Sequence, residues 1–261
     1  MNQISFASAC AQAIKKIESG KESPSGIGTL AEGVVHRALK IYFEPDESRH
    51  EIEIGGYVAD AAGEDGIIEV QTAGFGRMRP KLEAFLSAAP VTLVHPIIAE
   101  KTIFHVNPDS GQENINRITS RRKSPKRLNE WSVFRELYPI RDLLPNPSLK
   151  ICLCLIRIDE HRFGQKRRWQ KWKDLNIDPP RKYPTELIRE VWLGSPPDYS
   201  GLFLNEDIVA GIPPEFTAAN FAFQAGISAE GARLALPVLC ELGLVRCMGK
   251  RGNSYLYSLM E

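Results

Sequence analysis

The chain has 261 residues, with 33 lysines and arginines against 32 aspartates and glutamates, and a formal net charge of +1. This length exceeds one average domain, so it predicts either one large domain or two modest ones. The near-neutral charge argues against a uniformly basic protein that wraps nucleic acid, and local clusters of charge therefore matter more than the sum.

Cysteine usage and hydropathy favour a protein of the cytoplasm. The five cysteines are odd in number and form no Cys-x-x-Cys pair, which argues against a zinc knuckle and against a disulfide framework. The N-terminal residues lack a basic region followed by an apolar core, and no apolar run approaches membrane-spanning length. We therefore expect neither secretion nor membrane insertion, and a homodimer is compatible with these features.

In chain order, helices and strands alternate over the first hundred residues. Apolar residues at helical spacing predict a helix over 3–18, and after a Ser-, Gly- and Pro-rich loop Thr29 can cap a second helix that runs to about Tyr42. Strands are expected over 51–60 and 67–72, joined by a turn at 61–66. A helix over about 79–88 and an apolar strand over 91–98 complete an α-β-β-α-β core.

Residues 117–173 add one strand and two basic segments. An almost continuously apolar run at 149–158 predicts a strand buried on both faces that extends the sheet. The first basic segment spans 117–127, and the second spans 162–173 and is interleaved with Phe163, Trp169 and Trp172. Basic residues among aromatics suit phosphate contact and base stacking. The candidate DNA contacts in the two segments are Arg121, Arg122, Lys123, Arg167 and Arg168.

A pair of acids on the expected hairpin carries the chemical argument. Side chains two residues apart on a strand share a face, so Glu69 and Gln71 point together. If Asp60 pairs with Ile67, Asp60 also lies on the Glu69 face, with a diagonal backbone separation of about 7–8 Å; the alternative register puts it on the opposite face. Two carboxylates with substrate oxygens and waters suit Mg²⁺, with Mn²⁺ as an alternative.

This pattern resembles the PD-(D/E)xK nuclease superfamily, in which a helical Glu precedes a hairpin that carries Asp and then a Glu-x-Lys strand. The resemblance covers roughly residues 29–158 and implies an α/β fold with a restriction-endonuclease-like core, in which helices flank a mixed central sheet. It implies that Asp60 and Glu69 bind the metal, that Glu32 is the supporting helical acid, and that Gln71 stands where the lysine is usual. Lys81 on the next helix is the candidate that restores the missing positive charge.

The C-terminal segment resembles a winged helix domain. A composition break at Gly194-Ser195-Pro196-Pro197-Asp198 predicts a nuclease-like domain over 1–193, a linker over 194–202 and the winged helix over 203–261. Helices are expected from Thr217 and from Ser228, followed by two short strands. The resemblance implies DNA contacts from Arg233 in the second helix and from Lys250 and Arg251 in the wing.

Together these patterns predict a metal-dependent DNA endonuclease that hydrolyses phosphodiester bonds and holds DNA partly through its winged helix. Two alternatives remain, because the motif lacks its lysine and because the second C-terminal helix has few side chains that could read DNA bases. One is a catalytically inactive, nuclease-like regulator that binds DNA. The other is a protein-interaction module.

Overall fold

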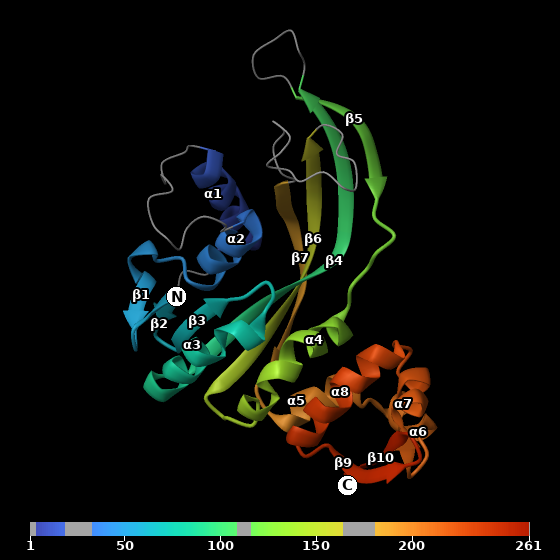
Figure 1. Ribbon diagram of the computed structural model, residues 1–261. Helices are drawn as coiled ribbons and strands as arrows, with labels where there is room; N and C mark the ends of the chain where they lie inside the picture. Colours follow the sequence, from blue (N-terminus) through green and yellow to red (C-terminus); the bar gives the residue numbers. More distant parts are fainter. Residues whose placement is uncertain (1–3, 19–32, 109–115, 164–180, 261) are drawn as a thin grey trace. The chain divides into compact units, whose positions relative to one another are not determined.

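The computed structural model of the chain describes residues 4–18, 33–108, 116–163 and 181–260. These residues form a mixed α/β structure with two compact units (Figure 1). The first unit holds the described residues of 1–48, 98–128 and 154–189, and the second holds those of 49–97, 129–153 and 190–261.

Helices are short in both units. The α-helices are α1 (Phe6–Glu18), α2 (Val34–Phe43), α3 (Phe75–Ala88), α4 (Phe134–Leu137), α5 (Pro196–Phe203), α6 (Glu206–Gly211), α7 (Ala218–Gln224) and α8 (Ala229–Glu241). The 3-10 helices are η1 (Glu47–Arg49), η2 (Glu130–Val133) and η3 (Tyr138–Leu143). Within the described ranges, no helix has the length and apolar content needed to cross a lipid bilayer.

Strands form a seven-stranded sheet and a smaller three-stranded one. The strands are β1 (His50–Ile54), β2 (Tyr57–Gly63), β3 (Gly66–Val70), β4 (Val91–Pro108), β5 (Asn116–Lys123), β6 (Leu149–Phe163), β7 (Arg181–Leu193), β8 (Phe216–Thr217), β9 (Val245–Arg251) and β10 (Ser254–Leu259). The large sheet has the order β1-β2-β3-β4-β6-β7, with β5 also paired to β4. It is mixed, as expected, because β1, β2 and β3 pair antiparallel whereas β3 and β4 pair parallel.

The strand expected over 51–60 is two strands joined by a tight turn. Gly55 and Gly56 have φ angles of 59° and 79°, and they reverse the chain between Ile54 and Tyr57. Positive φ at both turn residues matches the twist of a hairpin, and glycine adopts this conformation at little cost. The core of the second unit therefore has one more strand than the sequence pattern predicted.

The register between β2 and β3 differs by two residues from the expected one. Pairing is between Ala61 and Ile68 and between Gly63 and Gly66, so Ile67 pairs with Ala62 and not with Asp60, the pairing considered from the sequence. Glycine is required at 66, where φ is 116° and a Cβ would lie 2.2 Å from the Pro90 carbonyl oxygen. A shift of two residues keeps side chains on the same face, and continuing this register puts Asp60 opposite Glu69.

Helix α3 links β3 to the parallel strand β4. It begins at Phe75, four residues before the expected start, because the Glu136 carboxylate accepts hydrogen bonds from the backbone N–H groups of Gly74 and Phe75, at 2.5 and 3.2 Å. A carboxylate at a helix N-terminus satisfies free N–H groups and the helix dipole. Buried Leu82 and Phe85 direct one face of α3 into the core of the unit.

In the first unit, α1 packs against α2 (Figure 1). Strands β4 and β5 form an antiparallel ribbon in which Thr102 pairs with Lys123 and Phe104 pairs with Arg121. The first basic segment of the sequence thus includes a strand. The apolar run at 149–158 lies on β6 and is almost entirely buried, as expected.

The C-terminal residues form the expected helix pair with a small sheet. Thr217 and Ser228 cap α7 and α8, and β9 and β10 pair antiparallel, with β8 on the other edge of β10. Residues 194–202, expected as a linker, instead contain most of α5. Its prolines occupy the first helical positions, after a capping box between Ser195 and Asp198, and such prolines favour a helix start.

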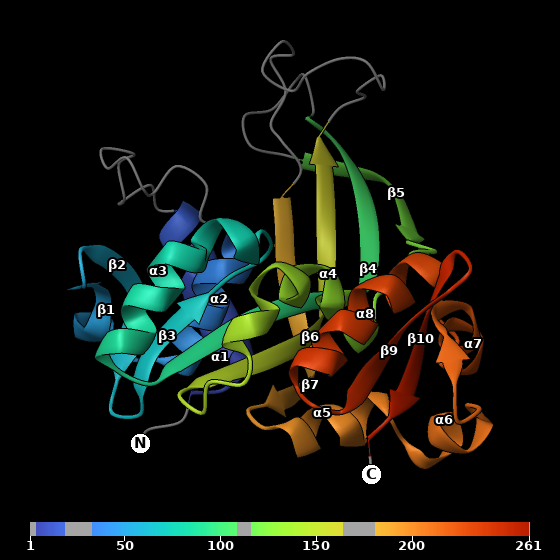
Figure 2. The ribbon, with the colours of Figure 1, turned by 60° about the horizontal axis from the view of Figure 1, so that its bottom comes forward.

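Aromatic side chains join these helices to the η2–α4 segment. The Phe203 ring of α5 lies 4.9 Å from that of Trp131 and 4.6 Å from that of Phe134, between centroids. Trp131 also contacts Phe221 of α7. Helix α8 packs against α4 and η3, and Figure 2 shows α8 beside α4.

Two phenylalanines on α7, one buried and one exposed, allow this packing to be tested by comparing their substitutions. Phe221 is fully buried, whereas Phe223 is 88% exposed. We expect Phe221→Ala to lower the free energy of unfolding by about 3–5 kcal/mol, through lost burial and a residual cavity. Phe223→Ala should change it by less than about 0.5 kcal/mol. Denaturant unfolding measures both values, and equal losses would contradict the packing.

Candidate functional site

The two acids lie where β2 and β3 stop pairing. The last backbone pair is Ala61 with Ile68, and beyond it the hydrogen bonds between the strands involve side chains. The backbone N–H of Asp60 donates to Glu69 Oε2 at 3.3 Å, and the backbone N–H of Val70 donates to Asp60 Oδ2 at 2.7 Å. Each carboxylate therefore accepts a hydrogen bond from the opposite strand, and both are held at the fork between the strands.

Lys81 of α3 reaches this fork. Its Nζ lies 2.5 Å from Glu69 Oε1, in a pair whose side chains are 22% and 5% exposed. The same Nζ lies 5.3 Å from the centroid of the Phe85 ring, one helical turn further along α3. The structure thus brings together Asp60, Glu69 and the lysine that the sequence suggested as a replacement for the missing one.

The electrostatics of the pair are dominated by burial. The pKa of Glu69 is raised to about 7, mainly by burial and also by the nearby Asp60 carboxylate, while Lys81 opposes the rise. A buried carboxylate favours its neutral form, and a like charge adds to that preference. Glu69 therefore exchanges its proton near neutral pH.

Gln71 occupies the loop just after β3. Its side-chain Nε2 donates to the Ala73 carbonyl oxygen at 2.5 Å, so its amide donor is used inside that loop. The Gln71 carbonyl oxygen lies 2.8 Å from Nδ1 of His95, a side chain on β4 whose pKa burial lowers. Glu32, expected as the helical acid, lies outside the described residues.

The donor set at the fork fits a hard divalent cation. Within the described ranges, no group of three or more His, Cys, Asp or Glu side chains is arranged to hold a metal ion. Mg²⁺ commonly takes only one or two protein carboxylates and fills its shell with waters and substrate phosphates. Asp60 and Glu69 are two carboxylates at one point of the sheet, the number that such a site commonly uses.

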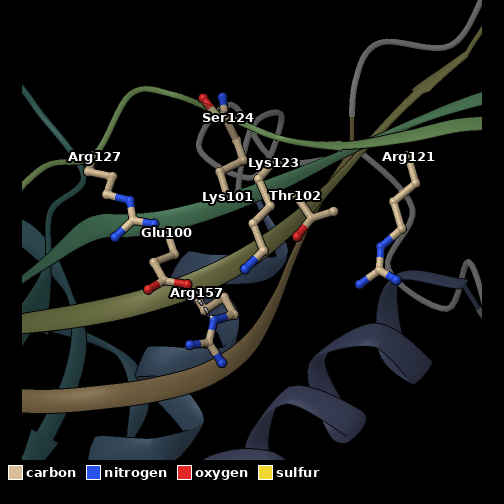
Figure 3. Close-up of a pocket in the computed structure, with 8 residues that line it drawn as sticks. All are labelled: Glu100, Lys101, Thr102, Arg121, Lys123, Ser124, Arg127 and Arg157. Carbon is tan, nitrogen blue, oxygen red and sulfur yellow. Dashed lines mark hydrogen bonds and ion pairs between the residues drawn. The ribbon is translucent and has the colours of Figure 1, made fainter.

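Three of the basic residues expected on 117–127, namely Arg121, Lys123 and Arg127, line a pocket of the first unit. Figure 3 shows the side chains around this pocket, which has a volume of about 290 Å³. Arg121 and Lys123 line it from β5, whereas Arg122 does not. Sequence reasoning missed Lys101 and Arg157, which line it from β4 and β6. The available signal was the position of Arg157 as a charge inside the apolar run of β6.

The remaining DNA candidates are spread over the chain. Arg233, Lys250 and Arg251 are exposed in the second unit. The Arg233 guanidinium donates to the Ala229 carbonyl oxygen of its own helix, and the Lys250 ammonium lies 4.9 Å from the centroid of the Tyr255 ring. Arg167 and Arg168 lie outside the described residues.

The Glu69 pKa has a measurable consequence for stability. Because the native state binds more protons than the unfolded chain between about pH 4.5 and 7, the Glu69 contribution to the free energy of unfolding should fall as pH rises through that interval. Glu69→Gln should remove this part of the slope. Glu64→Gln, at an exposed acid of the same hairpin, should keep it. Denaturant unfolding over this pH range tests the difference, and unchanged slopes in both variants would contradict it.

Comparison with known proteins places the chain in a family. A Treponema pallidum (strain Nichols) protein described as uncharacterized is 31% identical over 232 residues, which cover 88% of this chain and 86% of that protein. No solved structure matches. The family model described as "Domain of unknown function (DUF8091)" matches residues 33–193, which include both acids, Lys81 and the basic pocket. The chain therefore belongs to the DUF8091 family.

Proposed function

We propose that the protein is a metal-dependent endonuclease that hydrolyses phosphodiester bonds in DNA. The observation that carries the proposal is the convergence of Asp60, Glu69 and Lys81 at the fork between β2 and β3. Two carboxylates and one ammonium group, held in a partly buried position, are the side chains that such a reaction needs.

The three side chains have separate roles. Asp60 and Glu69 would hold Mg²⁺ or Mn²⁺ through carboxylate oxygens, and Lys81 keeps Glu69 oriented through its 2.5 Å contact. A divalent cation bound there would polarise the phosphoryl oxygen and make water more acidic. The Lys81 ammonium provides the positive charge that stabilises charge developing on the phosphate. Lys81, rather than Gln71, then takes the role that lysine has in the superfamily motif.

The arrangement of elements around the acids supports the same proposal. Strand β2 carries Asp60, β3 carries Glu69, α3 follows, and β4 returns parallel to β3. This is the order of hairpin, helix and core strand that the PD-(D/E)xK resemblance implies. Helix α2 precedes the hairpin in the chain, as that resemblance also requires.

We further propose that the C-terminal residues contact DNA through the hairpin of β9 and β10. Lys250 and Arg251 are exposed on β9, and Tyr255 on β10 is 50% exposed beside Lys250. An exposed surface of basic and aromatic side chains suits contact with the phosphate backbone of DNA. Helix α8 is less suited to enter a groove, because it packs against α4 and η3 and its Glu230 pairs with Arg135 at 2.6 Å.

Cleavage assays with paired variants test the proposal. Plasmid and linear duplex DNA with Mg²⁺ or Mn²⁺ should be cut by the wild type, and Asp60→Asn and Glu69→Gln should abolish cutting because each removes a metal-binding carboxylate. Asp65→Asn and Glu64→Gln change exposed acids in the same hairpin and should leave cutting unchanged.

Each other outcome points to an alternative. Salt-sensitive DNA binding without cleavage would favour the inactive, DNA-binding regulator. The absence of both binding and cleavage would favour the protein-interaction module. Cutting that persists in Glu69→Gln would mean that a contaminating nuclease is responsible, and it would refute the assigned site.

A second pair of variants identifies the source of positive charge. Lys81→Met should lower kcat by about 10²–10³-fold, the usual cost of losing one group that stabilises transition-state charge. Gln71→Ala should have a much smaller effect, because the Gln71 amide bonds to Ala73. Single-turnover cleavage rates compare the two, with thermal unfolding as the check on folding. A larger loss in Gln71→Ala would assign the role to Gln71 instead.

A further inference from the structure

The pocket beside β4 and β5 holds more positive than negative charge. Of its lining residues, Lys101, Arg121, Lys123, Arg127 and Arg157 are cationic and Glu100 is the single acid. Arg157 pairs with Glu100 at 3.1 Å and also with Glu186 of β7, and Lys101 pairs with Glu160 at 2.8 Å. Glu100 and Glu186 thus pair with Arg157, and Glu160 pairs with Lys101.

The other three cations of the pocket have no ion pair with an acid of the described ranges. Among the residues that the structure describes, Arg121, Lys123 and Arg127 form no ion pair. Arg121 is held instead by the Phe104 ring, whose centroid lies 5.5 Å from its guanidinium carbon. Arg157 lowers the pKa of Glu100 most strongly, and the charges of Arg127 and Lys123 act in the same direction.

The shape of the pocket makes this charge available to a ligand. Figure 3 shows Arg127, Lys123 and Arg157 directed toward the space around Glu100. The volume of about 290 Å³ is far above the roughly 10–15 Å³ that one water molecule needs. Alternation along β5 turns Arg121 and Lys123 to the pocket and leaves Arg122 on the other face.

We propose that this pocket binds a phosphate group, with Lys123 and Arg127 as its main contacts. Arginine forks match the geometry of phosphate oxygens, and a compact ammonium adds a strong point charge. Glu100 serves as an internal counter-ion, and an entering phosphate would compete with it for Arg127 and Lys123. The pocket belongs to the first unit and the two acids belong to the second, so phosphate binding here is a separate property from cleavage.

Binding measurements without divalent metal test the proposal, with inorganic phosphate in one arm and a fluorescent DNA duplex in the other. Lys123→Ala should weaken binding about tenfold, the usual cost of losing a hydrogen bond to a charged group. Arg122→Ala removes the same charge from the neighbouring position of β5 and should weaken binding less than about twofold. Glu100→Gln should strengthen binding, because it removes the competing carboxylate.

The two arms identify the source of the phosphate. Saturable binding of inorganic phosphate that responds to Lys123→Ala assigns a free phosphate or small phosphate ester, whereas a response in the duplex arm alone assigns a backbone phosphate. Binding of neither ligand, or equal losses in Lys123→Ala and Arg122→Ala, would overturn the proposal. These measurements contain no divalent metal and record binding rather than cutting, so failure of the nuclease assignment would leave this result intact.

Discussion

Two hydrogen bonds from backbone to carboxylate, from Asp60 N–H to Glu69 and from Val70 N–H to Asp60, are the constraint that fixes the fork between β2 and β3. At the point where β2 and β3 separate, two backbone N–H groups lose their strand partners, and the opposite carboxylates accept them. An apolar replacement would leave a partly buried donor unsatisfied, which is costly. Bringing two acids together also creates repulsion, which the Lys81 ammonium offsets. The residues that close the fork are therefore the same ones that give it chemical capacity.

The placement of the acids could be predicted from local pattern, but their exact pairing could not. The two-residue period of strands puts Asp60 and Glu69 on one face in either of two registers that differ by two residues. Choosing between them requires the close approach of Gly66 to Pro90, which is a contact between separate strands. The position of Lys81 similarly depends on the start of α3, where Glu136 binds Gly74 from far along the chain. Such contacts leave no periodic signal in the sequence.

The same division between local and distant causes applies elsewhere. The caps at Thr217 and Ser228 are local hydrogen bonds, so the starts of α7 and α8 were predicted correctly. The burial of Phe203 in α5 depends on rings from the η2–α4 segment, which is distant in the sequence. Residues 194–202 were therefore predicted as a linker. In the basic pocket, the cluster of basic residues on β5 could be recognised from the sequence composition alone. Arg157 was not, because only the sheet brings β6 beside β4.

The fork and the pocket also differ in how the chain reaches them. Asp60, Glu69 and Lys81 come from one hairpin and the helix that follows it, so they lie close together in the sequence, although Glu136 at the start of α3 is distant. The pocket instead joins strands separated by long stretches of chain, from Glu100 to Arg157. Closing short loops costs less entropy, and local contacts form faster. We therefore expect the contacts among Asp60, Glu69 and Lys81 to form earlier in folding than those that assemble the pocket.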